Sequence, residues 1–389
     1  MKLSNISIVA LYYLFTTFPL FGQQEVKLNE INSVRTAVPF LTIAPDSRSS
    51  AMGDVGVATT PDVNSQHWNP AKFVFMEKGG GVALSYSPWL RNLVDDMNLL
   101  YLTGYKRIDK FQTLSASLRY FDMGNITFRD DNANYLKEGR PNEFAIDLAY
   151  SRRFSDKLSA ALAFRYIRSD ISSGIPQAAG AKAKAGNSFA ADVSMYYHSK
   201  MEIAGKKGEW AVGANISNIG SKMSYTNEQE KTFIPINLRI GGSAGIYFDD
   251  YNKITLAIDL NKLLVPTPPI RSNSGSNEIL EGKDPNVGIV QGMFQSFYDA
   301  PGGFSEEMKE ITYGFGLEYF YRNVFAVRAG YMYEHPTKGN RKYFSMGVGL
   351  VMNVFEVDFS YLIPTYSGNP LANTLRFSLV FNFGQKATS

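Results

Sequence analysis

The chain of 389 residues contains no cysteine and only three histidines. Without cysteine there is no disulfide framework, no thiolate zinc site and no cysteine nucleophile. His67, His198 and His335 lie far apart in the sequence, and none belongs to a paired-histidine metal motif or a serine-hydrolase motif. We therefore expect a protein that is not an enzyme, with no catalytic residues, no metal site and no cofactor.

Charged residues are also scarce. They make up 19% of the chain, against about 25% in an ordinary soluble domain. The net charge is only +3, and no block of basic residues accompanies it. The sequence therefore predicts no nucleic-acid partner. Aromatic residues, in contrast, reach 14%.

No apolar run in the chain is long enough for a transmembrane helix, which needs about 20 residues. The longest candidate, Ile6–Phe21, follows Lys2, and Gly22 fits the position before a signal-peptidase cut. This pattern predicts a cleaved signal peptide over residues 1–22 and an exported mature chain that begins near Gln23. If the mature chain lies in a membrane, it must cross with strands.

Alternation of apolar and polar residues dominates the rest of the sequence. Near the C-terminus, Leu375, Phe377 and Leu379 share one face of an extended segment, and Arg376 and Ser378 share the other. Most of the fourteen segments with this pattern have about ten residues, the length at which a tilted strand crosses a bilayer. They are 79–87, 97–107, 110–122, 143–155, 157–169, 188–199, 208–218, 234–248, 251–261, 311–322, 324–333, 341–351, 353–362 and 372–383.

The connections between these segments alternate between short and long. Short turns follow every even-numbered segment, with a slightly longer one at 199–207, and longer loops follow the odd-numbered ones. Outer-membrane barrels have short periplasmic turns and long extracellular loops. We therefore predict an all-β fold, a 14-stranded antiparallel transmembrane β-barrel over residues 79–383 with a tail at 384–389. Both termini then lie in the periplasm. A soluble β-sandwich is the alternative, but it would have one strongly polar face.

The second face of the strands is rich in small and polar residues, which indicates a wettable lumen. Its charged residues are expected to pair across the interior: Arg119, Asp147, Arg165, Asp192, Arg239, Asp259, Glu318, Arg328, Glu356, Asp358 and Arg376. Aromatic residues near strand ends, among them Tyr86, Tyr196, Tyr197 and Phe383, predict two interfacial girdles.

Two regions fall outside the predicted barrel wall. Residues 23–78 are too apolar for a loose periplasmic tail and contain four prolines, so we expect them to fold back into the lumen as a plug. The connection 262–310 has apolar residues at helical spacing. It either caps the mouth of the barrel or presents a partner-binding stripe. For the second case the candidates are Ile289, Val290, Met293, Phe294 and Phe297.

The run Ala37–Asp54, continued by Val57–Thr59 and Pro61–Lys72, closely resembles the PorV family of the type IX secretion system. Its Ala-Met-Gly-Asp and Trp-Asn-Pro-Ala pieces are looser signs of the wider group of FadL-like plugged barrels. Within the run, the plug motif consists of Pro39, Pro45, Asp46, Arg48, Met52, Gly53, Asp54, Trp68, Asn69 and Pro70.

The resemblance implies an outer-membrane component that is not itself the secretion pore. It would bind the C-terminal signal domain of secreted cargo at a large translocon, the SprA/Sov type. It would then pass the cargo to a PorU-like sortase complex at the cell surface. Membrane lipids would surround the barrel. The alternative function is a FadL-like outer-membrane transporter of hydrophobic small molecules, which predicts an apolar ligand pocket and a lateral opening in the wall.

Overall fold

The computed structural model describes residues 31–90, 96–130, 132–171, 183–203, 205–225, 231–272, 278–365 and 374–386. The expected signal peptide, residues 1–22, lies outside these ranges. The chain divides into two units after Ile31, and the second unit, Asn32–Ser389, contains the fold described below.

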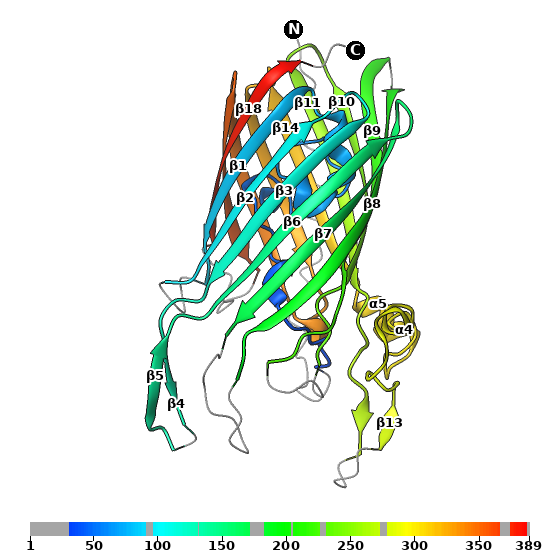
Figure 1. The fold of residues 1–389 in the computed structure, drawn as a ribbon. Coiled ribbons are helices and arrows are strands. Elements are labelled where there is room, and N and C mark those ends of the chain that lie inside the picture. Colours follow the sequence, from blue (N-terminus) through cyan, green and yellow to red (C-terminus); the bar gives the residue numbers. More distant parts are fainter. Residues whose placement is uncertain are drawn as a thin grey trace. The chain divides into compact units, whose positions relative to one another are not determined.

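Fourteen strands close into one antiparallel barrel, as the alternation predicts (Figure 1). The first and last strands pair with each other over Lys78↔Lys386 to Tyr86↔Phe377, and this pairing closes the wall. The wall strands are β1 (Lys78–Pro88), β2 (Asn98–Arg107), β3 (Gln112–Asp122), β6 (Asn142–Arg153), β7 (Leu158–Asp170), β8 (Gly186–Ile203), β9 (Lys206–Gly220), β10 (Asn237–Tyr247), β11 (Asn252–Leu263), β14 (Thr312–Tyr321), β15 (Phe325–Tyr333), β16 (Lys342–Met352), β17 (Phe355–Pro364) and β18 (Leu375–Lys386).

The two faces of each strand have opposite environments. In β7, Leu162 and Phe164 are exposed on the outside, whereas Ser159 and Arg165 are buried inside. Period-two side-chain geometry sends successive residues to opposite faces, so the hydrophobic pattern fixes the register. The prediction that Tyr196 belongs to an interfacial girdle is wrong. Its neighbour Met195 is exposed on the outside of β8, so alternation along the strand places Tyr196 inside, where it is buried.

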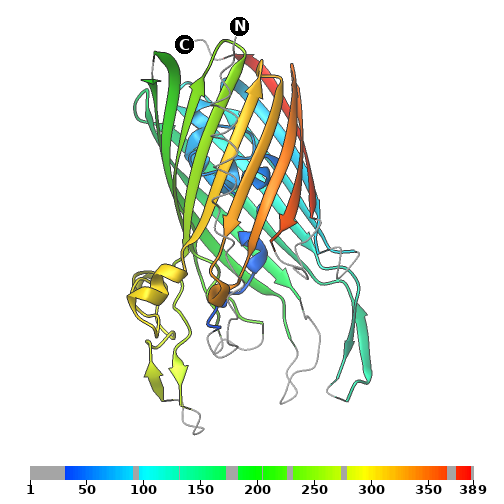
Figure 2. The same cartoon turned by 180° about the vertical axis from the view of Figure 1, so that it is seen from behind.

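Short turns lie at the end of the barrel where β1 begins and β18 ends, and the long connections lie at the other end (Figures 1 and 2). The turn predicted at 199–207 is much tighter than expected, because β8 and β9 stay paired out to Ile203↔Lys206. Two long connections contain small hairpins that the sequence did not predict. These are β4 (Ile126–Arg129) with β5 (Tyr135–Gly139), and β12 (Ile270–Arg271) with β13 (Ile279–Glu281).

Residues 37–76, here called the lumen segment, lie inside the barrel (Figures 1 and 2). The segment contains η2 (Pro39–Thr42), α2 (Ser47–Ala51), α3 (Ser65–Trp68) and η3 (Pro70–Phe75). Prolines begin η2 and η3, where their missing N–H needs no partner. Helix α2 contacts β15 to β18, while η3 contacts β3, β6, β7 and β8 on the other side.

The long connection between β11 and β14 contains α4 (Ile289–Gln295) and α5 (Phe304–Lys309) (Figure 1). The connection between β15 and β16 contains η5 (Pro336–Lys338). Within the described ranges, every helix is too short or too polar to span a bilayer.

Candidate functional site

The lumen segment begins its contacts with the wall at α2. Asp46 caps this helix, because its Oδ2 accepts a hydrogen bond from Ser49 N at 2.9 Å. Its other carboxylate oxygen accepts a bond from Trp68 Nε1 at 2.6 Å. One buried carboxylate therefore joins the two halves of the motif, which are 22 residues apart in the sequence.

Arg48 connects α2 to the wall. Its guanidinium donates two hydrogen bonds to Glu318 of β14, Nε to Oε2 at 3.0 Å and Nη2 to Oε1 at 2.9 Å, and a third from Nη1 to Asp62 at 2.8 Å. Glu318 also accepts from Arg328 Nε at 2.7 Å, and Arg328 pairs in turn with Asp358. Arg48, Glu318, Arg328 and Asp358 are almost completely buried, and Asp62 is partly buried. Removing one member would leave an uncompensated buried charge, so the network strongly favours the seated segment.

Polar groups of the wall also hold the backbone of the lumen segment. Asp259 Oδ2 accepts hydrogen bonds from Gly56 N at 2.8 Å and from Val57 N at 3.0 Å. Arg119 Nη1 donates to Leu41 O at 2.9 Å. Because irregular backbone cannot satisfy its own donors and acceptors, these contacts replace the bonds that water would make.

The lysine of the motif run is buried as well. Lys72 Nζ donates to Gly56 O at 2.8 Å and to Thr59 Oγ1 at 3.1 Å, both within the lumen segment. Burial lowers the pKa of Lys72 to about 8. This ammonium therefore stabilises the fold of the segment and is not available to solvent.

Strand glycines allow the segment to touch the wall. A Cβ on Gly330 of β15 would lie 2.0 Å from Gly53 N, and a Cβ on Gly316 of β14 would lie 2.8 Å from Met52 O. Glycine is therefore required where the two backbones approach this closely. Glycine is a weak strand former, and this close approach explains why it nevertheless occurs in the middle of β14 and β15.

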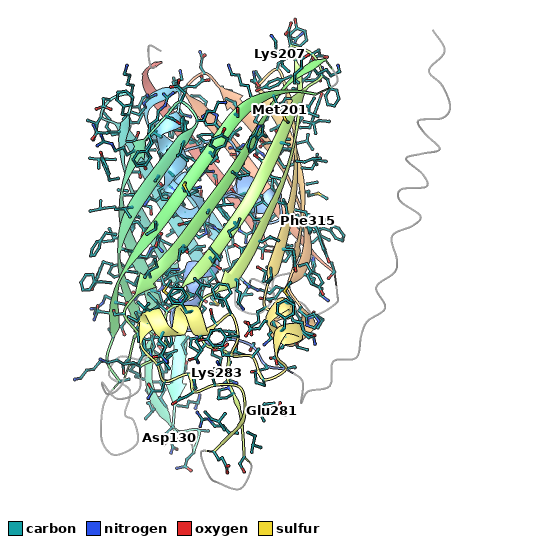
Figure 3. The ribbon with its side chains drawn as sticks, turned by 90° about the vertical axis from the view of Figure 1, so that its right-hand side faces the viewer. Asp130, Met201, Lys207, Glu281, Lys283 and Phe315 are labelled. Carbon is teal, nitrogen blue, oxygen red and sulfur yellow. The ribbon has the colours of Figure 1, made fainter. Side chains whose placement is uncertain are left out.

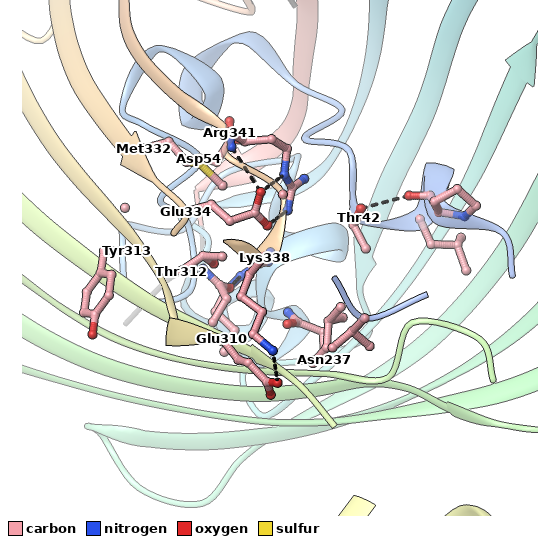
Figure 4. Close-up of a pocket in the computed structure, with 18 of the residues that line it drawn as sticks. Thr42, Asp54, Asn237, Glu310, Thr312, Tyr313, Met332, Glu334, Lys338 and Arg341 are labelled. Carbon is pink, nitrogen blue, oxygen red and sulfur yellow. Dashed lines mark hydrogen bonds and ion pairs between the residues drawn. The ribbon is translucent and has the colours of Figure 1, made fainter. Parts of the chain in front are cut away.

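The ten motif residues lie together in the lumen, although the sequence alone did not indicate their partners on the wall. Eight of them are buried, and three of the ten line a cavity: Pro39, Gly53 and Asp54. The cavity has a volume of about 290 Å³ (Figure 4). It lies between the lumen segment and the connections that follow β11 and β15, and Glu310, Glu334 and Arg341 contribute charged groups to its lining.

Seven of the eleven interior charges form ion pairs as expected, whereas four form none within the described ranges: Arg119, Arg239, Asp259 and Arg376. Arg165 of β7 pairs with Asp147 of β6 and with Asp192 of β8. Arg239 of β10, in contrast, forms no ion pair with any residue in the described ranges; it stacks on Trp68, with 4.5 Å between the guanidinium carbon and the ring centroid.

The candidate partner-binding residues divide into two groups. Val290, Phe294 and Phe297 are exposed, with Phe294 at 67%, whereas Ile289 and Met293 are partly buried and pack against a core cluster that includes Phe233. Helix α5 adds two exposed residues, Phe304 at 78% and Met308. We name the five exposed residues the outer apolar surface: Val290, Phe294, Phe297, Phe304 and Met308. Figure 3 shows side chains of this region below the barrel wall.

Buried ion pairs hold this connection in place. Lys262, near the end of β11, donates to Glu307 at 2.9 Å and to Glu310 at 2.6 Å. Lys338 of η5 donates to Glu310 at 2.9 Å and to Glu306 at 2.5 Å. The network ties α5 to the barrel rim and to a second connection. Sequence reasoning missed it, because its members are 28 to 48 residues apart and no local pattern relates them.

Asp299 lies beside this network. Its Oδ2 accepts hydrogen bonds from Thr267 N at 3.2 Å and from Gln295 Nε2 at 3.4 Å. Burial, and then repulsion from Glu307 and Glu310, raise the pKa of Asp299 to about 6. In the described part of the chain, no group of three or more histidines and acids is arranged to hold a metal ion.

A family model described as "Type IX secretion system protein PorV" matches residues 26–270. Among solved structures, the chain is similar to the toluene transporter TodX of Pseudomonas putida, with 10% identity, a TM-score of 0.51 and coverage of 91% of this chain and 100% of that chain. It also matches the toluene transporter TbuX of Ralstonia pickettii, with 12% identity, a TM-score of 0.45 and coverage of 87% and 98%. No curated protein matches the sequence. The likeness to TodX shows a shared fold.

Proposed function

The chain belongs to the PorV family of type IX secretion system proteins, and from this premise we propose that it is a cargo shuttle of the outer membrane. It binds the C-terminal signal of secreted proteins at the translocon and carries them to the cell-surface sortase and attachment complex. In this orientation the long connections face outward. The short turns, the start of β1 and the end of β18 face the periplasm.

One observation carries the proposal: the lumen is occupied. Arg48 and Arg119 bind the lumen segment to opposite parts of the wall, at β14 and β3, and the backbone of the segment occupies the space beside the strand glycines. A folded cargo protein cannot pass through such a lumen. The protein therefore acts on cargo at its outer face, while another barrel provides the pore.

The outer apolar surface is our candidate for contact with the translocon. Exposed aromatic side chains are typical anchors of protein interfaces, and Phe294 and Phe304 stand on a connection that buried ion pairs hold in place. A surface that is already ordered loses little conformational entropy when it binds. Ile289 and Met293 serve instead to seat α4 on its core cluster.

The alternative is a FadL-like transporter of hydrophobic small molecules. The fold shared with TodX supports it, but the cavity in this lumen is lined by charged side chains such as Arg239, Glu334 and Arg341. Glu334 and Arg341 pair with each other, but a hydrophobic solute would leave the terminal nitrogens of Arg239 without a partner, which is costly. The cavity therefore favours the secretion role.

Affinity isolation of the full chain from membranes tests the proposal. We expect a very large outer-membrane barrel protein, cargo with the C-terminal signal domain and a sortase complex to be recovered with it. Recovery of none of these, together with a hydrophobic molecule whose removal abolishes function, would support the transporter instead. Recovery of neither would contradict both.

A further inference from the structure

Two charged groups that line the 290 Å³ cavity form no salt bridge with any described residue. Four of the six acidic and basic side chains in its lining are paired, since Lys338 binds Glu310 at 2.9 Å and Arg341 binds Glu334 at 2.8 Å (Figure 4). Arg239 and Asp54 remain. Within the described residues, neither has an oppositely charged side chain in salt-bridge contact.

Arg239 offers hydrogen-bond donors to the cavity. Its Nε donates to Asn261 Oδ1 at 2.6 Å, and its two terminal nitrogens have no partner among the described residues. The residue is 9% exposed, and its guanidinium lies over the ring of Trp68. A buried guanidinium fixed in this way is suited to a carboxylate, which it can bind through two parallel hydrogen bonds.

His67 adds a second donor beside the same indole. Its ring lies 4.6 Å from Trp68, centroid to centroid, and its Nδ1 is 2.5 Å from Arg119 Nη2. An arginine can only donate, so Nδ1 is the acceptor and the proton of the neutral imidazole is on Nε2. Burial and three nearby arginines lower the pKa of His67, which keeps the ring neutral. Nε2 is buried and has no partner within the described part of the chain.

Asp54 supplies the complementary acceptor. Its Oδ2 accepts a hydrogen bond from Tyr343, but its Oδ1 is buried with no partner among the described residues. Asp54 has a left-handed backbone, with φ of 60°, next to Gly53 in the motif run. A buried carboxylate oxygen without a donor is costly, and an ammonium group would satisfy it.

We propose that this cavity binds a small zwitterion of the free amino acid class. The carboxylate lies against Arg239 and His67, and the ammonium lies against Asp54. One positive and one negative group in the cavity lack a charged partner, so a ligand with one group of each sign can pair with both. The cavity is near the lower end of the size range of ligand sites, which suits a small molecule. This site is independent of cargo transfer.

Titration calorimetry on the purified full chain in detergent tests the proposal with L-alanine, L-leucine and L-glutamine as probes. We expect saturable binding of at least one of them. The N-acetyl derivative of the amino acid that binds lacks the ammonium, and its amide derivative lacks the carboxylate. Each should bind at least tenfold more weakly than the parent amino acid; for L-alanine these derivatives are N-acetyl-L-alanine and L-alaninamide.

Two variants test the named groups. Arg239→Gln and Asp54→Asn should each weaken binding at least tenfold, and Asn tolerates the left-handed backbone at position 54. Lys222→Gln, which removes a positive charge outside the cavity, should leave affinity unchanged. A heat-modifiable barrel band on gels shows that each variant is folded. Absence of saturable binding, equal binding of either derivative, or unchanged affinity in both folded cavity variants would overturn the proposal.

Discussion

Arg48 and Glu318 form a buried, two-pronged ion pair between the lumen segment and the barrel wall, although they lie 270 residues apart in the sequence. Such fork-to-fork geometry fixes orientation as well as distance. The pair therefore determines where α2 sits in the lumen.

Breaking this pair should release the segment. Glu318→Gln leaves Arg48 and Arg328 without their shared partner, so we expect a loss of about 3–5 kcal/mol in the free energy of unfolding. Urea unfolding in detergent and protease cleavage within residues 37–76 would measure it. Lys253→Gln, which removes a pair with Glu209 at the more exposed rim, should cost only about 0–1 kcal/mol. Equal effects of the two variants would contradict the anchoring role of Glu318.

The close approach at Gly330 gives a second prediction. Gly330→Ala places a methyl group against Gly53 N, and overpacking of this kind costs about 1–3 kcal/mol. We expect a lower thermal unfolding temperature and faster proteolysis of the lumen segment. Gly288→Ala is the matched control, because a Cβ there meets nothing within 4 Å and its φ is −62°. A wild-type unfolding temperature for Gly330→Ala would show that the backbones are further apart.

The outer apolar surface gives the third prediction. Val290→Ser with Phe294→Ser should reduce recovery of the translocon at least tenfold without changing barrel stability, because both side chains are exposed. Met293→Leu conserves the volume of a residue in the core cluster and should leave recovery unchanged. Point variants are sharper than deletion of 285–300, which would also remove the hydrogen bonds of Gln295. Undiminished recovery with the double variant would remove this surface from the interface.

The raised pKa of Asp299 gives a pH prediction. Its pKa of about 6 lies above the unfolded value near 3.9, so the protonated form favours the folded connection. This contribution is fully present below about pH 4 and is lost as pH rises through 6. Amide exchange at Thr267 should therefore become more protected, after correction for intrinsic rates, between pH 7 and pH 5.

The control for this prediction is Asp299→Asn, which mimics the protonated acid and should flatten the pH dependence in that window. Glu306 has a lowered pKa: burial opposes the shift, and the hydrogen bond from Lys338 and other partners outweigh it. The contribution of ionised Glu306 to the stability of the connection is lost only at lower pH, as the pH falls through the pKa that Glu306 has in the folded protein. Protection that falls between pH 7 and pH 5 would contradict the assignment to Asp299.

Local pattern was sufficient for the wall. In β18, Phe377 and Leu379 face out and Arg376 and Ser378 face in, as their alternation predicts. Period-two geometry is a property of the strand itself and needs no distant information. Tyr196 shows the limit of this reasoning. Its place near a strand end predicts an interfacial position, but the alternation of the strand directs its side chain inward.

Pairings across the lumen could not be predicted in the same way. The sequence indicated that interior charges pair, but it did not indicate which residues form the pairs. No local pattern relates Arg48, which lies outside the strands, to Glu318, and none relates Lys262 to Glu310. Such pairs depend on which strands stand opposite each other after closure. Among the charged groups that line the cavity, Arg239 and Asp54 have no salt bridge within the described residues, and this is visible only once the partners of the others are known.

The sequence by itself determined fourteen strands, the direction of most side chains, and the motif that relates the chain to the PorV family. It could do so because alternation and turn chemistry are local, and because a motif is read directly from the residues. The tertiary structure alone decided how the lumen segment is held, which apolar residues of 289–297 are exposed, and where a polar cavity remains. Those features depend on distances between residues far apart in the chain, which closure of the barrel fixes.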